Sequence, residues 1–157
     1  MTLQDLGTYS GRGFFPLMSP NRYFSLDEAN RAVAQVAPLL LQSQDLQTRA
    51  IRTKERLDRL WQRLERGEPV LDDIASLQQQ LDHTTREFTS VLARLEAIGC
   101  ILRDLEVGLV DFPARVDDTE LYLCWRLGEE GIQYWHGMDE GYAGRKPITT
   151  MPGTRIH

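Results

Sequence analysis

The feature that most constrains the fold is a pair of long amphipathic runs separated by a short break. The first run carries a stripe at Leu39, Ser43, Leu46, Ala50, Thr53, Leu57, Leu60 and Leu64. The second run carries one at Val70, Ile74, Leu77, Leu81, Thr84, Phe88, Val91, Leu95 and Ile98. Alternating steps of three and four residues keep one stripe of a helix facing a partner. Since Gly67-Glu68-Pro69 interrupts the pattern, we expect a long antiparallel, coiled-coil-like helical hairpin.

The segment before the first run has the start signal of a helix. Ser25 and Glu28 stand at capping-box spacing, in which the serine hydroxyl and the glutamate carboxylate each accept from the other residue's N–H. A first helix is expected to run to about Val36. Pro38 has no N–H and disfavours helical geometry at Ala37. The sequence therefore predicts a kinked N-terminal helix, or a second helix that begins near Pro38.

After Gly99 the apolar period changes from a helical period to two. The runs 110–116 and 121–125 alternate apolar and polar residues, and Asp117-Asp118 between them fits a two-residue hairpin turn. Residues 132–136 form a third candidate strand. The predicted fold class is α+β, with a small three-stranded antiparallel β-meander packed on the hairpin. We expect a flexible arm at 1–22, a single domain at 23–148 and a tail at 149–157.

Length and composition narrow the class of protein. A chain of 157 residues with 41% hydrophobic residues fits one globular domain. It has no apolar run long enough for a transmembrane helix and no secretory signal at its start, so no membrane association is expected. Its two cysteines form no framework, which favours a cytoplasmic location. The net charge of −5 argues against nucleic acid as a general partner.

The charge is unevenly distributed along the chain. Residues 38–66 are locally basic, with seven arginine or lysine side chains between Arg49 and Arg66, whereas residues 99–157 lean acidic. This division could orient an acidic partner or a second copy of the chain. A solvated helix face beside an acidic sheet explains it equally.

The expected hairpin turn places several reactive side chains on one face of the sheet. Counting back from the turn, Asp111 opposes Cys124, and the next pairing sets Tyr122 opposite His136, with Tyr134 beside them. Further candidates lie in flanking loops: Asp104, Glu129, Asp139 and Arg145. The ligand or metal candidates are therefore Asp111, Tyr122, Glu129, His136, Asp139 and Arg145.

Two chemistries suit these residue types. A carboxylate, an imidazole and a thiolate together can bind Zn²⁺, and a His–Asp pair can act as an acid/base couple. The sequence lacks the spacing of a known zinc or phosphate motif and shows no cofactor-binding motif. A structural role explains the same residues: His136 as a surface or interface histidine, Cys124 as an inert buried thiol, and Arg145 in an ion pair with a sheet carboxylate.

Five short motifs resemble one family in both sequence and order. They are Phe24 to Asn30, Gly108 to Pro113, Leu123 to Glu129, Tyr134 to His136 and Gly141 to Arg145. Over residues 23–148 the chain is similar to an uncharacterised prokaryotic family catalogued as domain of unknown function 2203. The resemblance implies a bacterial-type cytosolic protein and supplies no activity, cofactor or catalytic residue.

The leading functional hypothesis is a non-enzymatic oligomerising or protein-interaction module, most simply a homodimer through the hairpin. The long stripe and its small residues Ser43, Ala50 and Thr53 motivate it, because a two-helix hairpin buries only one stripe. The alternative is a metal-binding protein or small enzyme that uses the polar sheet face and the Gly141–Arg145 loop. Catalytic residues cannot be assigned from the sequence.

Overall fold

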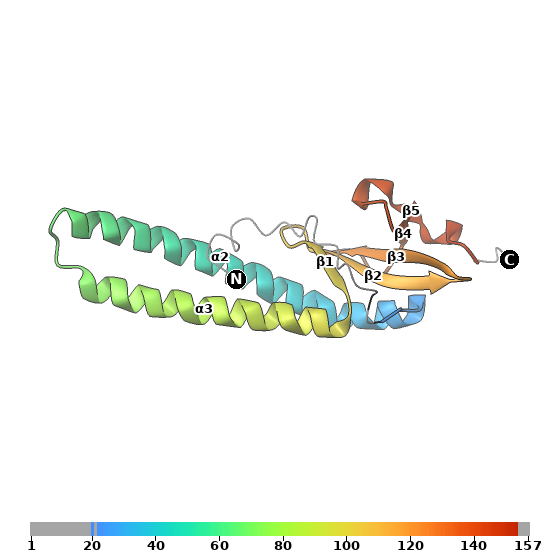
Figure 1. Ribbon diagram of the computed structural model, residues 1–157, viewed down its shortest axis with the longest axis horizontal. Coiled ribbons are helices and arrows are strands. Elements are labelled where there is room, and N and C mark those ends of the chain that lie inside the picture. Colours follow the sequence, from blue (N-terminus) through green and yellow to red (C-terminus); the bar gives the residue numbers. More distant parts are fainter. Residues whose placement is uncertain (1–19, 21, 154–157) are drawn as a thin grey trace.

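The computed structural model describes residues 20 and 22–153. The expected arm at 1–22 therefore lies almost wholly outside the described residues, as do the last four residues of the expected tail. Figure 1 shows a hairpin of two long helices with a sheet at one end, beside the first turns of α2, and the turn between the helices at the other end.

The first helix, α2 (Leu26–Glu65), begins at the predicted capping box. The Ser25 hydroxyl accepts from the Glu28 N–H at 3.1 Å, and the Glu28 carboxylate accepts from the Ser25 N–H at 3.2 Å. Of the two alternatives predicted at Pro38, a separate second helix is wrong, since α2 continues through this residue as one helix of 40 residues. Buried Val36, Leu39 and Leu40 flank the proline, and their packing outweighs the hydrogen bond that it removes.

The second helix, α3 (Leu71–Ile98), completes the hairpin. The predicted stripes face each other: the first contributes Leu39, Ser43, Leu46, Ala50 and Leu57, and the second contributes Val70, Ile74, Leu77, Leu81, Thr84, Phe88, Val91 and Leu95, all buried. Gly99 caps α3 with a φ of +104°, a left-handed conformation that favours glycine. The antiparallel hairpin predicted from the sequence is confirmed.

The sheet has five antiparallel strands in sequence order, so the predicted three-stranded meander is too small. The strands are β1 (Ile101–Asp104), β2 (Leu109–Val116), β3 (Thr119–Arg126), β4 (Tyr134–Gly137) and β5 (Lys146–Pro147). The missed strands are the two edges, of four and two residues. Strands this short carry too few residues for an alternating pattern, and β1 also contains a bulge after Leu102.

The register of the central strands agrees with the prediction. Asp117 and Asp118 both have positive φ, as a two-residue hairpin turn requires, and Asp111 pairs with Cys124. Tyr122 pairs with His136 across β3 and β4.

The apolar face of the sheet packs against the helices. Phe112 meets Phe24 edge to face at 5.1 Å, and Val110, Leu121, Leu123 and Trp125 are buried in the same core. The sheet therefore presents its second, polar face away from this core. Within the described residues, neither helix is long and apolar enough to cross a membrane.

Candidate functional site

The polar face of the sheet brings together four of the side chains singled out in the sequence. Asp111 comes from β2, Tyr122 and Cys124 from β3, and His136 from β4. Asp111 is 1% exposed, Cys124 0% and His136 2%. Because β3 lies between the other two strands, Asp111 and His136 meet above it, between Tyr122 and Cys124.

Asp111 is held at both carboxylate oxygens. Its Oδ1 lies 2.9 Å from His136 Nε2, and its Oδ2 accepts from Arg103 Nε at 2.8 Å. The Arg103 guanidinium also lies over the Tyr122 ring, 4.9 Å from its centre, and the His136 ring lies 5.3 Å from that of Tyr122. Arg103 was missed in the sequence because β1 was missed. The bulge of β1 falls at this residue, and a bulge re-aims a side chain.

Both ring nitrogens of His136 face acceptors. Nδ1 lies 2.9 Å from the Gly137 carbonyl oxygen, and Nε2 faces the Asp111 carboxylate. This arrangement suits an imidazolium that donates twice. Burial lowers the pKa of His136, but the hydrogen bond and the charge of Asp111 outweigh it and raise the pKa above its ordinary value.

Cys124 is a buried thiol beside this pair. Burial raises its pKa most, and the charge of Asp111 raises it further, although the positive charge of Arg145 opposes the shift. A thiol held protonated in this way is a poor nucleophile. These surroundings fit the interpretation of Cys124 as an unreactive buried residue.

A second ion pair adjoins Cys124. Arg145 donates to Glu129 Oε1 at 2.5 Å, and its guanidinium lies 3.9 Å from the centre of the Tyr134 ring and 4.7 Å from that of Tyr142. Glu129 also accepts from the Arg126 N–H at 2.9 Å. The predicted ion pair of Arg145 is therefore present, but its partner Glu129 lies in the loop after β3 and not on a strand as expected. The guanidinium is engaged with this carboxylate.

Asp139 does not join the site. It is exposed in the segment after β4 and is absent from the buried cluster. The neighbouring Glu140, which sequence reasoning did not select, accepts from Lys146 Nζ with both oxygens at 2.9 Å and from the Gly137 N–H at 3.0 Å. These interactions fasten the segment after β4 to β5.

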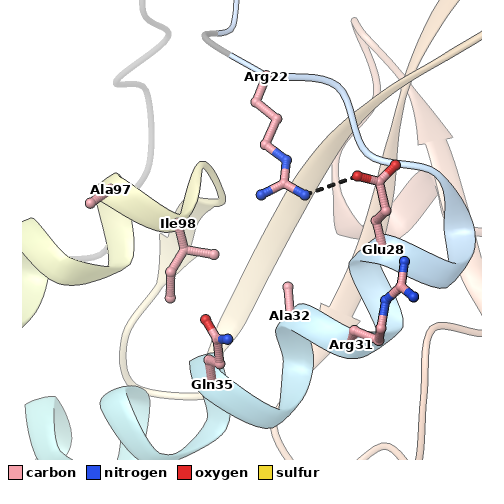
Figure 2. Close-up of a pocket in the computed structure, with 7 residues that line it drawn as sticks. All are labelled: Arg22, Glu28, Arg31, Ala32, Gln35, Ala97 and Ile98. Carbon is pink, nitrogen blue, oxygen red and sulfur yellow. Dashed lines mark hydrogen bonds and ion pairs between the residues drawn. The ribbon is translucent and has the colours of Figure 1, made fainter.

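The described part of the chain also has a pocket of about 560 Å³ elsewhere, between the start of α2 and the end of α3. Figure 2 shows Arg22 and Glu28, paired at 3.0 Å, on one side of it and Ile98 on the other. None of the polar-face residues lines this pocket. Arg22 lies over the Phe24 ring at 4.1 Å, so its charge is already engaged by local contacts.

The polar face can therefore serve in two ways. Its oxygen, nitrogen and sulfur atoms are close enough together to bind an ion, and its buried ion pairs can stabilise the sheet. Acid/base catalysis requires a substrate within hydrogen-bonding reach of His136 or Asp111. Since both are buried, their present positions favour an ion over a bulky substrate.

Comparison with known families confirms the resemblance seen in the sequence. The family described as "Uncharacterized conserved protein (DUF2203)" matches residues 22–148. The chain belongs to this family. No curated protein and no solved structure matches it. The family's function is unknown, and the DUF2203 region of this chain covers the whole hairpin and the sheet.

Proposed function

We propose that this protein is a non-enzymatic interaction module that self-associates through the outer part of its hairpin. The observation that carries the proposal is the exposure of large apolar side chains there. Trp61 is 48% exposed, Leu71 62% and Ile51 38%. Exposed single apolar residues are common on proteins, but three on one projecting element favour an interface.

The distal hairpin is the part of the hairpin beyond Gln44, residues 45–85. Gln44 donates to the carbonyl oxygens of Leu105 and Glu106, which ties α2 to the segment between β1 and β2. Beyond this point the hairpin projects away from the sheet (Figure 1). Each helix there buries one stripe against the other, and bundles of helices gain stability by covering the remaining surface.

A second copy of the chain is the occupant that the charges favour. Residues 45–66, the second part of α2 with its C-cap Arg66, carry seven arginine or lysine residues against four acidic ones. Residues 71–98 of α3 carry five acidic residues against two arginines. Two hairpins that pack α2 of one protomer against α3 of the other thus bring opposite charges together in a symmetric interface. We propose a homodimer of this kind, in the cytoplasm, where its buried thiols stay reduced.

A matched pair of variants tests whether the exposed surface around Trp61 forms the dimer interface. Trp61→Glu places a charge at the proposed interface, and Gln62→Glu adds the same charge at the next exposed position. Light scattering of the full chain is expected to show a dimer for the parent and for Gln62→Glu. Trp61→Glu should weaken dimerisation about 30-fold, corresponding to a loss of about 2 kcal/mol for an interface anchor.

Two results would count against this assignment. If Trp61→Glu and the parent have the same dimer dissociation constant, the interface does not include the surface of the distal hairpin around Trp61. A parent that is monomeric yet retained by an acidic protein in a salt-sensitive way would replace self-association with binding of an acidic partner.

A further inference from the structure

We propose that Asp111, Cys124 and His136 form a binding site for a borderline-soft divalent cation, with Zn²⁺ as the best fit. The three residues offer one carboxylate oxygen, one sulfur and one ring nitrogen, and these atoms lie within 4.8 Å of one another. This inference goes beyond the interaction function, because it concerns the sheet and does not depend on the state of the hairpin.

The donor atoms are close to the spacing that zinc requires. Bonds of about 2.0–2.3 Å in a tetrahedron place ligand atoms roughly 3.3–3.8 Å apart. His136 Nε2 and Asp111 Oδ1 are 2.9 Å apart and would have to open by a few tenths of an ångström. Cys124 Sγ lies within 4.8 Å of a carboxylate oxygen of Asp111 and a ring nitrogen of His136, and it would have to approach them by at most about 1.3 Å. Side-chain torsions can supply both movements.

The surroundings of His136 are those of a metal ligand. A histidine that binds a metal through one ring nitrogen commonly donates the other N–H to a carbonyl or a carboxylate. His136 Nδ1 has the Gly137 carbonyl oxygen at 2.9 Å, which fixes Nε2 as the nitrogen that faces the cluster. The ring therefore needs no reorientation to coordinate an ion.

Arg103 supplies the corresponding support for Asp111. It occupies Oδ2 at 2.8 Å and leaves Oδ1 directed at the cluster. A carboxylate whose one oxygen accepts a hydrogen bond can coordinate a metal through the other oxygen alone. Arg103 is thus a positioning residue for the proposed site.

The neighbouring arginines do not exclude a cation, because the same layer holds two carboxylates. Asp111 pairs with Arg103 and Glu129 pairs with Arg145. Coordination of an ion by Cys124 releases the thiol proton, and the resulting thiolate adds a negative charge beside the ion.

The donor set also selects the kind of ion. Thiolate and imidazole suit zinc and its neighbours, whereas Mg²⁺ and Ca²⁺ prefer oxygen ligands. Three protein ligands leave a fourth position of a tetrahedral site for water. Since all three side chains are buried, entry of the ion requires local opening or takes place during folding.

Cobalt titration tests the proposal on the full chain. Chelator-treated, reduced protein is titrated with Co²⁺ both in the native state and during refolding from urea, and the absorption spectrum is recorded. We expect a near-ultraviolet thiolate-to-cobalt band at one equivalent, its loss when Zn²⁺ is added, and no competition from Mg²⁺. Absence of the band in both arms would overturn the proposal.

Two cysteine variants assign the sulfur. Cys124→Ser is expected to lose the band while Cys100→Ser keeps it, because Cys100 lies at the end of α3 and outside the cluster. Circular dichroism checks that each variant is folded. A band of equal intensity in Cys124→Ser would contradict the assignment.

The zinc ligands can also be identified without the Cys124→Ser variant, in case that variant does not fold. Zinc X-ray absorption on Cys100→Ser leaves the proposed ligands intact, and it should show one sulfur at about 2.3 Å with nitrogen and oxygen completing the shell. A shell of oxygen and nitrogen alone would rule out Cys124 as a ligand and overturn the site.

Discussion

At the residue scale, the most consequential feature is a buried carboxylate with two cationic partners. Asp111 pairs with Arg103 and His136, and the relative exposure of its side chain is 2%. Removing one partner of a buried ion pair leaves the other charge without compensation. Arg115 and Asp118 form an ion pair of the same residue types, but both side chains are exposed to water. The two pairs therefore differ in burial and not in the groups that interact.

Asp111→Asn is therefore expected to destabilise the metal-free protein by about 3–5 kcal/mol, since Arg103 and His136 lose their counter-charge. Urea unfolding in the presence of a chelator measures the loss. Asp118→Asn is the matched control, because the Arg115–Asp118 pair is exposed, and it should cost less than about 1 kcal/mol. Equal losses for the two variants would show that the buried network contributes little.

The capping box gives a pH-dependent prediction. The hydrogen bond from the Ser25 N–H lowers the pKa of Glu28 below its ordinary value of 4.5, and Arg22 lowers it further. Because the folded pKa is below the unfolded one, the stabilisation is fully present above pH 4.5 and is lost as the pH falls through the folded pKa. NMR titration of the Glu28 carboxyl should give a midpoint below 4.5; a midpoint at or above this value would contradict the account.

At the element scale, the turn after β1 depends on a glycine in a confined position. Gly108 has a φ of +72°, and a Cβ added there would lie 2.6 Å from the Leu127 Cβ. Gly128 has a φ of +102° with no atom within 4 Å of such a Cβ. The two positions share a left-handed backbone and differ in the space around it.

This difference can be measured with two alanine variants. Gly128→Ala should cost about 1–2 kcal/mol, from the left-handed backbone alone. Gly108→Ala should cost a further 1–3 kcal/mol or so, because the added methyl group forces β2 and Leu127 apart. Thermal or urea unfolding compares the two, and a Gly108→Ala variant no less stable than Gly128→Ala would refute the close contact.

The elements also show how far the sequence could predict the fold. The hairpin and the β2–β3 register followed from strong local signals: two long apolar stripes, a capping box, and a two-residue turn at Asp117-Asp118 that permits one alignment. The turn placed Asp111 opposite Cys124 and so revealed half of the polar site. The alternative of a second helix beginning near Pro38 was wrong, because the local cost of the proline is offset by burial of Val36, Leu39 and Leu40 in the core that α2 shares with α3.

The edge strands and the residues they carry could not be predicted, because they depend on contacts with distant parts of the chain. The edge strands β1 and β5 exist through pairing with distant strands, and their own residues are too few to show a period. Arg103 lies on one of them and entered the site only with the structure. Glu129 and Arg145 were recognised as candidates, but their pairing depends on how two loops approach in space.

At the scale of the whole molecule, the protein combines a sheet with a buried ionic face and a hairpin that projects beyond it (Figure 1). The two parts use polar residues differently. On the polar face of the sheet, Asp111, Arg103 and His136 are paired within one chain and shielded from water. On the distal hairpin, the basic and acidic stretches lie on separate helices, which favours pairing between chains.

Self-association is tested by sedimentation equilibrium of the unmodified full chain at micromolar concentrations, in low and in high salt. We expect a dimer in low salt whose dissociation constant rises with salt, because the opposed charges of α2 and α3 are screened. A chain that remains monomeric at every concentration and salt condition would contradict it.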